Sequence, residues 1–591
     1  MKQFLLTLAG VFGGLILFFV GVPILLLVMI ASSAKPAPPP ANSVLTLDLR
    51  QALSDQDAGN PFGFLGGRSL SVVSVVETLH RAERDARVKG LLIRLPEAGV
   101  GPAEADELRT AIRAFRATGK PVLAHSQGIY ASGVAPATYM LGAASGQFWM
   151  QPGAALQVTG IAAQETFFKR LFDKYGVHAD YQQRYEYKNA VNPFLYPDFT
   201  PAHREAELGW MTSIYSSELA AAAADRKLDP AKLKATLEAG PYGAEEAASQ
   251  GLIDKLGQVE EAEAAIRTQT GNAEFVELSK YLAGAGADSN NGGAAVAVIG
   301  AEGEIVTGTS GNEGFSRSSN VYSDDVAKAF REAIEDKAVK AIVFRVSSPG
   351  GSDTASEQIL AGVKAAKAAG KPVVVSMGAY AASGGYWISS AASEIIADPT
   401  TLTGSIGVFG GKFALGDALG RFGVDQKSIS VGGEFSTAFT SADPFTGSQR
   451  AQVSAWMDRI YAGFVQRVAD GRHLPVARVR EIAKGRVWTG AQAQSLGLVD
   501  KLGGYYTALA EAKRLAGIAA DQTVTIKRLP EKRSPFDALQ HAFGATSASI
   551  RVLAASAWLL GDPRAQGVMD DMARARLGPD ASTVRAPTPL H

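Results

Sequence analysis

Three short segments of this 591-residue chain recur in the same order, and this internal duplication constrains the fold more than any other feature of the sequence. The pairs begin at residues 88 and 339, 119 and 370, and 251 and 497, so the offset is 251 for the first two pairs and 246 for the third. Their sequences are Val88–Arg94 (VKGLLIR) and Val339–Arg345 (VKAIVFR), Gly119–Leu123 (GKPVL) and Gly370–Val374 (GKPVV), and Gly251–Gly257 (GLIDKLG) and Gly497–Gly503 (GLVDKLG). Three matches in order indicate two copies of one domain.

Each copy is predicted to be an α/β domain. In the second copy, residues 341–346 and 372–376 are short, β-branched apolar runs of the kind that form buried parallel strands. The segment 356–370 between them has apolar residues at helical spacing and ends in a glycine suited to a helix C-terminus. Strand, helix and strand with short connections make a βαβ unit. The chain is therefore expected to carry two tandem α/β domains.

The N-terminal segment predicts a membrane anchor. Between Phe4 and Ile30 the only polar side chain is Thr7, and this apolar run is long enough to cross a hydrocarbon core of about 30 Å. A cleaved signal peptide is the alternative, but its apolar region is usually only about 7–15 residues long. The positive-inside rule then places the N-terminus in the cytoplasm and the bulk of the chain on the periplasmic or extracytoplasmic side.

Composition suggests the remaining boundaries, because a proline-rich stretch follows the anchor and a Gly/Asn-rich stretch separates the copies. The predicted segments are a transmembrane anchor at 4–31, a proline-rich linker at 32–43, a first repeat at 44–280, a linker at 281–295, a second repeat at 296–530, and a C-terminal extension at 531–591 that is expected to be helical.

Charge and cysteine content argue against several function classes. The chain has 58 Lys and Arg residues and 58 Asp and Glu residues, so no net charge draws it toward nucleic acid. It contains no cysteine, which removes disulfides, cysteine-ligated zinc and cysteine nucleophiles. No cofactor, metal or nucleic-acid partner is expected.

The two copies differ where a catalytic site would lie. After its first strong strand the second copy has Ser347–Ser352 (SSPGGS), whereas the first copy has Leu95–Val100 (LPEAGV). Gly350 and Gly351 permit a tight turn whose N–H groups can face a cleft, as in an oxyanion hole. A strand-to-helix turn without chemistry is the alternative interpretation.

Ser383 is the candidate nucleophile. It lies a few residues past the next predicted strand, in Met377–Tyr386 (MGAYAASGGY), before a helix predicted at 386–392. Small neighbours allow a substrate backbone to approach, although a serine at this position also suits a helix N-cap. In the first copy the corresponding region offers Ser132, but it lacks the paired glycines.

A serine nucleophile needs a base, and Lys188 is the candidate. The seven histidines lie outside both glycine-rich motifs, although a Ser-His-Asp arrangement remains open because triad members converge in space. Lys188 lies among tyrosines and apolar residues in 184–194 (RYEYKNAVNPF), where desolvation would lower its pKa; a surface lysine is the alternative. Ser436 occupies the matching place in the second copy, so one copy keeps the lysine and the other the serine.

Four ordered motifs resemble the signal peptide peptidase family in its long, two-repeat bacterial form, also called protease IV. They are Ser347–Gly351 (SSPGG), Tyr380–Tyr386 (YAASGGY), Leu402–Val408 (LTGSIGV) and Tyr187–Phe194 (YKNAVNPF), and the resemblance covers roughly residues 1 to 530. The family belongs to the fold superfamily of the Clp proteolytic subunit and the crotonases, so the resemblance implies two tandem Clp/crotonase-like domains.

The resemblance also implies a Ser/Lys dyad, with Ser383 as nucleophile and Lys188 as general base. Ser405 corresponds to the family serine that orients the lysine, and Gly350, Gly351 and Gly384 are the oxyanion candidates. It further implies a homotetramer on the outer face of the inner membrane, acting on cleaved signal peptides and other apolar peptides.

Two other function classes stay open at this point. A crotonase-like acyl-CoA enzyme would use the same N–H pair for a thioester enolate, and a catalytically silent membrane scaffold would use the serines only as caps. The sequence does not indicate whether Lys188 and Ser383 pair within one chain or between subunits, but a working pair should lie near 3 Å apart.

Overall fold

Two α/β repeats make up the described part of the chain. A computed structural model describes residues 39–56, 70–284, 293–310 and 320–530, together with isolated residues between 3 and 18. Both repeats belong to one compact unit, 35–58 and 69–530. The predicted anchor at 4–31 lies largely outside the described residues, and the extension at 531–591 lies wholly outside them.

Among the residues that the structure describes, no helix is both long enough and apolar enough to cross a membrane.

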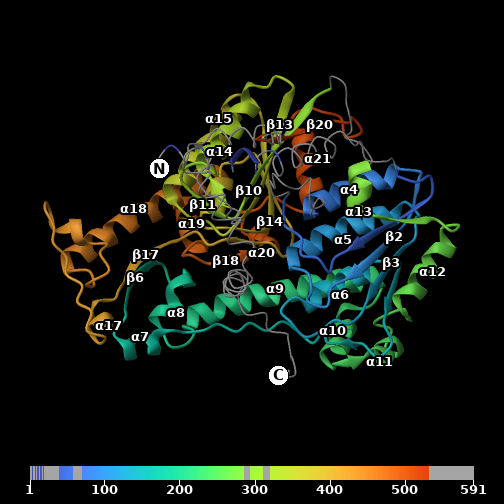
Figure 1. Ribbon diagram of the computed structural model, residues 1–591, viewed down its shortest axis with the longest axis horizontal. Helices are drawn as coiled ribbons and strands as arrows, with labels where there is room; N and C mark the ends of the chain where they lie inside the picture. The colour runs from blue at the N-terminus through green and yellow to red at the C-terminus, as the bar shows by residue number, and fades with distance from the viewer. Residues whose placement is uncertain are drawn as a thin grey trace. The chain divides into compact units, whose positions relative to one another are not determined.

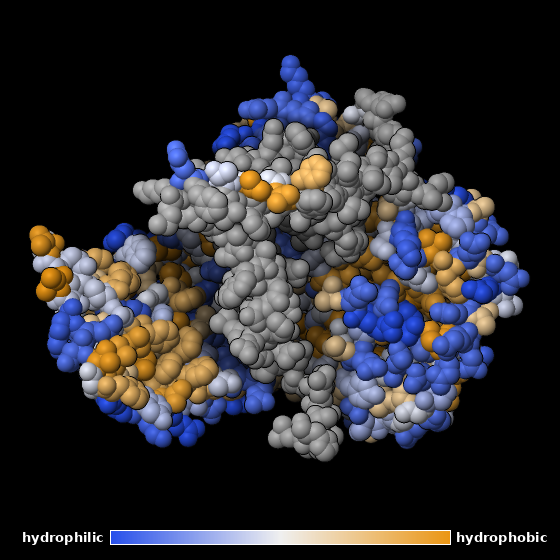
Figure 2. All heavy atoms as spheres, viewed as in Figure 1, coloured by the Kyte–Doolittle hydropathy of each residue, from blue (hydrophilic) through white to orange (hydrophobic). Residues whose placement is uncertain are grey.

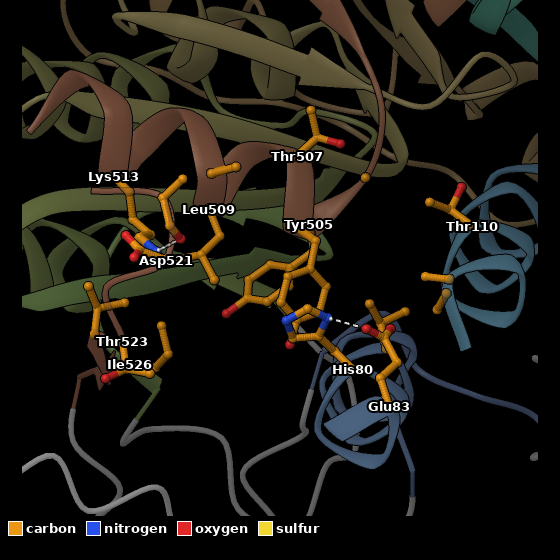
Figure 3. Close-up of a pocket in the computed structure, with 18 of the residues that line it drawn as sticks. His80, Glu83, Thr110, Tyr505, Thr507, Leu509, Lys513, Asp521, Thr523 and Ile526 are labelled. Carbon is orange, nitrogen blue, oxygen red and sulfur yellow. Dashed lines mark hydrogen bonds and ion pairs between the residues drawn. The ribbon is translucent and has the colours of Figure 1, made fainter. Parts of the chain in front are cut away.

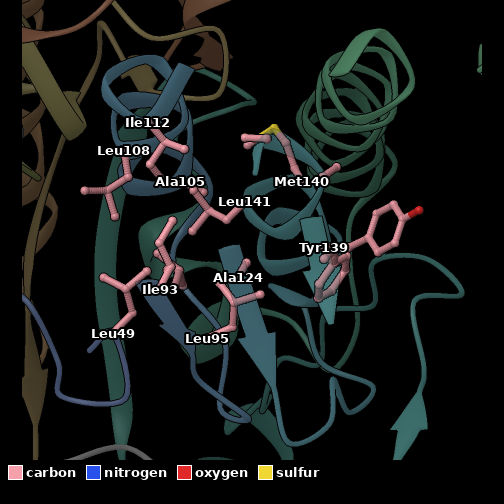
Figure 4. Close-up of a cluster of buried hydrophobic side chains, with 14 of the residues drawn as sticks. Leu49, Ile93, Leu95, Ala105, Leu108, Ile112, Ala124, Tyr139, Met140 and Leu141 are labelled. Carbon is pink, nitrogen blue, oxygen red and sulfur yellow. The ribbon is translucent and has the colours of Figure 1, made fainter. Parts of the chain in front are cut away.

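The first repeat is built on a six-stranded parallel sheet with the order β8-β4-β3-β2-β1-β9. Its strands are β1 (Ser43–Asp48), β2 (Val88–Leu95), β3 (Val122–Ser126), β4 (Gln147–Met150), β8 (Lys255–Leu256) and β9 (Glu274–Glu277). Its larger helices are α4 (Val72–Arg84), α5 (Pro102–Ala117), α6 (Ala135–Ala144), α9 (Pro201–Arg226), α10 (Pro230–Glu238), α11 (Ala244–Ser249), α12 (Val259–Gln269) and α13 (Leu278–Gly284). Figure 4 shows how the sheet and helices α5 and α6 enclose an apolar core that includes Ile93, Leu108 and Leu141.

The second repeat contains a sheet of the same order, β19-β15-β14-β13-β10-β20. Its strands are β10 (Ala295–Glu302), β13 (Val339–Ser348), β14 (Val373–Ala382), β15 (Glu394–Ala397), β19 (Lys501–Leu502) and β20 (Thr525–Leu529), with β16 (Leu402–Gly404) and β18 (Val487–Thr489) added beside β14. Its helices are α14 (Ser323–Glu335), α15 (Asp353–Ala368), α16 (Gly384–Ser389), α17 (Gly416–Gly420), α18 (Gly447–Arg472), α19 (Val476–Ile482), α20 (Gly490–Ser495) and α21 (Tyr505–Leu515). The duplication read from three short segments is thus present in the strand order as well.

The predicted βαβ unit is confirmed. Strands β13 and β14 pair in parallel, and α15 connects them. The Ser352 side chain caps α15 by accepting a hydrogen bond from the N–H of Ala355 at 3.3 Å, and Gly370 follows the helix with a φ of 77° that favours glycine. Strand β14 extends farther than the apolar run predicted, to Ala382, so Ser383 follows the strand immediately.

A pair of strands joins the two repeats at one end of the unit. Strand β6 (His178–Arg184) of the first repeat pairs antiparallel with β17 (Val408–Ala414) of the second, so each repeat contributes one strand to this small sheet. Figure 1 shows both strands at the left of the molecule, beside α7 (Lys169–Tyr175) and α8 (Asn192–Leu195). We call these elements, together with α17 and residues 421–439, the arm. The remaining short strands are β5 (Ala155–Leu156) with β7 (Tyr242–Gly243), and β11 (Glu304–Val306) with β12 (Asn320–Tyr322).

A buried arginine also joins the repeats. Arg345 on β13 donates to Asp55 at 2.5 and 3.0 Å and to Glu107 on α5 at 2.7 Å, and both carboxylates belong to the first repeat. All three side chains are at most 5% exposed. Burial alone would lower the pKa of Arg345, but the carboxylates of Asp55 and Glu107 raise it well above its usual value. The guanidinium therefore stays charged between two carboxylates at the junction of the repeats.

Replacing Arg345 with Met should destabilise the fold strongly. The change leaves two buried carboxylates without their counter-charge, a loss of about 3–5 kcal/mol in comparable cases. The matched control is Arg528→Met, because Arg528 also pairs across the repeats, with Glu77, but its side chain is 42% exposed. That variant should lose less than about 1 kcal/mol. Urea denaturation measures both, and an equal loss in the two variants would contradict this role for Arg345.

Candidate active site

The base candidate reaches the second repeat through the arm. After β6 the chain turns, and the N–H groups of Tyr185 and Tyr187 both donate to the carbonyl oxygen of Lys484, at 3.2 Å each. Lys188 comes next, directly before the 3₁₀ helix η2 (Asn189–Val191). The position of Lys188 is therefore set by backbone contacts with the second repeat, although its sequence belongs to the first.

The nucleophile candidate occupies a strained turn between β14 and α16. Ser383 has φ 55° and ψ −117°, a conformation that costs an L-residue of order 1–3 kcal/mol. Its N–H donates to the carbonyl oxygen of Gly404 at 2.9 Å, and its own carbonyl accepts from Trp387 at 2.9 Å. Ser405 and Lys484 also have positive φ, at 49° and 57°. Such strained positions often cluster at functional sites.

These two segments bring a lysine and two serines together. Nζ of Lys188 lies 3.0 Å from Oγ of Ser383, 2.9 Å from Oγ of Ser405 and 3.0 Å from the Ser405 carbonyl oxygen. A neutral amine has two N–H bonds and one lone pair. It can donate both hydrogens to Ser405 and accept the hydroxyl proton of Ser383. The three contacts thus suit proton transfer from Ser383 to Lys188.

Burial makes this proton transfer feasible near neutral pH. The Lys188 residue is only 4% exposed, and desolvation lowers the pKa of its amine from 10.5 to about 7. The protein supplies this shift by excluding water. A base with a pKa near 7 is half neutral at physiological pH, whereas an ordinary lysine is almost wholly protonated.

The glycine-rich turn lies against the nucleophile. A Cβ at Gly350 would lie 2.6 Å from the backbone nitrogen of Gly384 and 2.9 Å from Cβ of Ser383, so only glycine fits there. A Cβ at Gly384 would in turn lie 3.1 Å from the nitrogen of Gly351. The N–H of Gly350 donates to Oγ of Ser348 at 3.2 Å, which favours Gly351 and Gly384 over Gly350 as oxyanion donors.

A larger cavity lies away from Ser383 and Lys188. It measures about 900 Å³, and α4 and α5 of the first repeat and α21 of the second repeat contribute to its lining (Figure 3). Two of its polar side chains already have partners: Nδ1 of His80 lies 3.3 Å from Glu83, and Nζ of Lys513 donates to two carbonyl oxygens. Neither Ser383 nor Lys188 lines it, so we place the candidate site at the serine and lysine instead.

The structure thus brings together, in one chain, residues that the sequence analysis named separately. Nζ of Lys188 lies within 3.0 Å of the hydroxyl oxygens of both Ser383 and Ser405, and the three candidate glycines lie beside Ser383. The weaker candidate Ser132 lies in an exposed loop before α6.

Sequence reasoning missed the turn at Lys484–Arg486, which has no recognisable motif. It also missed the role of Arg345, although an arginine inside a buried apolar strand was a signal that could have found it.

Comparison with known proteins bears on the chemistry. The model of peptidase family S49 matches residues 114–272 and 365–519, once in each repeat. The chain belongs to peptidase family S49. Among its relatives, Protease 4 of Salmonella typhi is 34% identical over 502 residues, which cover 80% of this chain and 79% of the relative. Protease 4 of Haemophilus influenzae is 30% identical over 475 residues (77% and 75%), and the chloroplastic serine protease SPPA of Arabidopsis thaliana is 29% identical over 499 residues (82% and 71%).

Membership of family S49 makes the chain a serine peptidase, and the expected resemblance to the long protease IV form is confirmed. Each repeat carries one match to the S49 family model, but the candidate lysine comes from one repeat and the candidate serine from the other.

Burial of Lys188 should make the free energy of unfolding depend on pH. In the folded protein its pKa is about 7, whereas in the unfolded chain it returns toward 10.5. Between these values the unfolded state binds more protons, so the wild-type protein gains stability as pH rises. The free energy of unfolding of Lys188→Met should therefore exceed that of the wild-type protein by the largest margin below pH 7, and this margin should shrink toward pH 10.

Urea denaturation of both proteins at pH 6, 8 and 10 measures this difference. Lys427→Met, at an exposed position, is the control and should differ from wild type by the same amount at each pH. A stability difference between Lys188→Met and wild type that does not change from pH 6 to pH 10 would contradict the burial argument.

Proposed function

We propose that this serine peptidase is a membrane-anchored endopeptidase with a Ser/Lys dyad, in which Ser383 is the nucleophile and Lys188 the general base. The observation that carries the proposal is the distance of 3.0 Å between Nζ of Lys188 and Oγ of Ser383. It combines with burial that lowers the pKa of the amine to about 7. A histidine base is not needed for such a pair.

In the acylation step, neutral Lys188 accepts the hydroxyl proton of Ser383 as Oγ attacks the peptide carbonyl carbon. The negative charge moves to the carbonyl oxygen, where the N–H groups of Gly351 and Gly384 would stabilise it; one such donor contributes about 2.7–4 kcal/mol in a well-studied peptidase. Protonated Lys188 then gives its proton to the leaving amine. Ser405 holds the amine in place through both of its oxygens.

Deacylation reverses these roles. Lys188 is neutral again after it has protonated the leaving amine, so it can take a proton from a water molecule that attacks the acyl-enzyme. The serine leaves with the proton that Lys188 returns to it. One buried amine thus serves both halves of the reaction, and neither repeat alone holds the complete pair.

We further propose that the substrates are cleaved signal peptides and other apolar, membrane-associated peptides. Support comes from a cavity of about 350 Å³ whose lining is mostly apolar. It includes Tyr380 and Leu402, which pair across β14 and β16 three residues before Ser383 and Ser405, together with Ile161 and Trp210 of the first repeat; neither serine lines it. An extended apolar peptide would be compatible with such a surface.

The N-terminal sequence supports a single-pass anchor in the inner membrane, with both repeats on the periplasmic or extracytoplasmic side. A homotetramer is the assembly that we propose. The arm exposes large apolar side chains, and Figure 2 shows hydrophobic residues gathered on that side of the molecule. They include Leu171, Phe422, Ile429 and Val431, the last two fully exposed. Patches of this kind commonly mark interaction surfaces.

Ser383→Ala and Lys188→Ala should each abolish cleavage of an apolar fluorogenic peptide, with kcat/KM reduced by at least about 10³-fold. In the wild-type protein, kcat/KM should rise with pH through about 7, because the active form carries the neutral amine. Circular dichroism should show that both variants remain folded. The matched control is Lys232→Ala, at an exposed position on α10 outside the arm, which should cleave normally. Turnover close to wild type in folded Lys188→Ala would refute the dyad.

Removal of residues 1–34 should release the protein from the membrane without loss of the dyad. The full-length chain should fractionate with membranes, and the detergent-solubilised protein should have the mass of four chains by light scattering. The shortened chain should appear in the soluble fraction and still react with a serine-directed acylating probe. A full-length protein that is soluble without detergent, or that has the mass of one chain, would contradict the proposed anchor or the proposed tetramer, respectively.

A further inference from the structure

One turn of the second repeat lies between the lysine and its serine partners. In the turn Lys484–Arg486, the Lys484 carbonyl accepts the N–H groups that precede Lys188, as described above. On its other side, Ser405 donates its N–H to the Arg486 carbonyl at 2.8 Å, and Gly485 donates to the Ile406 carbonyl at 2.9 Å. The same three-residue turn is therefore bonded to the segment that carries Lys188 and to the segment that carries Ser405.

The middle residue of this turn touches the backbone of the lysine. Gly485 has a φ of 83°, and a Cβ at this position would lie 2.5 Å from Cβ of Lys188. It would also lie 2.6 Å from the Lys188 nitrogen and 2.7 Å from its Cα. These atoms cannot rotate away as the end of a flexible side chain can. Any residue larger than glycine must therefore displace either Lys188 or the turn.

Contacts on the outer side hold the same two segments together. Nζ of Lys484 lies 2.9 Å from a carboxylate oxygen of Glu186, two residues before Lys188. The guanidinium of Arg486 lies 4.8 Å from the ring centre of Tyr187 and donates to Glu205 at 2.7 Å. Both pairs join the repeats, and they restrict movement of the Lys188 segment away from the turn.

We propose that Gly485 is a positioning residue for Lys188: because it has no side chain, the Lys188 backbone can lie against the 484–486 turn, which encloses the base and sets its reach to Ser383 and Ser405. The inference rests on the proposed function of Lys188 as the base. It assigns the placement of that base to a residue of the opposite repeat, nearly 300 residues farther along the chain.

A methyl group at Gly485 would open this packing. Relief of the 2.5 Å contact to an ordinary 3.4–4 Å separation moves the Lys188 backbone or the turn by about 1 Å, and this loosens the packing that encloses the side chain and lets water approach it. A hydrated amine is easier to protonate, so less of it is neutral at pH 7. The variant should therefore behave as an enzyme whose base is present but needs a higher pH to work.

The experiment compares Gly485→Ala with Gly370→Ala across pH 5–10. Gly370 is the matched control because its φ is 77°, close to that of Gly485, and no atom lies within 4 Å of a Cβ built there. Both variants thus place an alanine at a similar positive φ, but only one meets Lys188. In Gly485→Ala, the rising limb of the pH profile of kcat/KM should shift to higher pH by at least about one unit. At pH 6 this shift lowers kcat/KM about tenfold, and kcat/KM should recover toward pH 9. Gly370→Ala should keep the wild-type limb.

Two results would overturn the inference. One is a rising limb of Gly485→Ala at the wild-type pH with wild-type kcat/KM; the other is an equal loss of activity at every pH with no shift of the limb. Lys188→Ala, measured in parallel, separates this failure from failure of the proposed function. An inactive Lys188→Ala beside a normal Gly485→Ala would reject only the positioning role, whereas an active Lys188→Ala would reject the dyad itself.

Arg486→Gln provides a second test that does not add volume to the packed turn. It removes the stacking of Arg486 on Tyr187 and on Trp488 and the ion pair with Glu205, from a side chain that is partly exposed. If Gly485→Ala does not fold, the limb of Arg486→Gln decides the question. An upward shift smaller than that expected for Gly485→Ala supports the positioning role of the turn, and an unchanged limb overturns it.

Discussion

The enclosure of one amine is the constraint on which the rest of the candidate site depends. Lys188 is buried against two serines, and in the described part of the chain no carboxylate forms an ion pair with it. A buried ammonium without a counter-charge is unfavourable, and the lowered pKa is the expression of that cost. This cost arises because both repeats enclose the amine. One repeat supplies the lysine, and the other supplies Ser383, Ser405 and the turn around Gly485.

Two kinds of contact hold the repeats in the arrangement that this enclosure needs. One is local, the pairing of β6 with β17 and the bonds of residues 185–187 to Lys484. The other is the buried cluster in which Arg345 on β13 donates hydrogen bonds to Asp55 and Glu107 of the first repeat. The local contacts place the lysine, and the buried arginine fixes the sheet from which the glycine-rich turn and the nucleophile emerge.

Much of this could be predicted from the residues. The duplication, the βαβ unit around α15 and the role of Gly370 at its end follow from local patterns, and the structure confirms them. The candidates Ser383 and Lys188 also came from comparison of the copies, because each copy lacks what the other has. The extent of β14 was underestimated, since residues 378–382 (GAYAA) do not form a β-branched apolar run although they continue the strand. Arg345 and Gly485 were missed because their partners lie in the other repeat.

The sequence by itself determined that the chain is a duplicated α/β protein and which short motifs could carry chemistry, because strand and helix periodicity and turn glycines are local properties. Tertiary structure alone decided that the lysine of one repeat meets the serine of the other within one chain, at 3.0 Å. It also decided that the lysine is enclosed enough to lose its proton near pH 7. Distance and desolvation depend on the packing of residues almost 200 positions apart, and a linear pattern does not encode them.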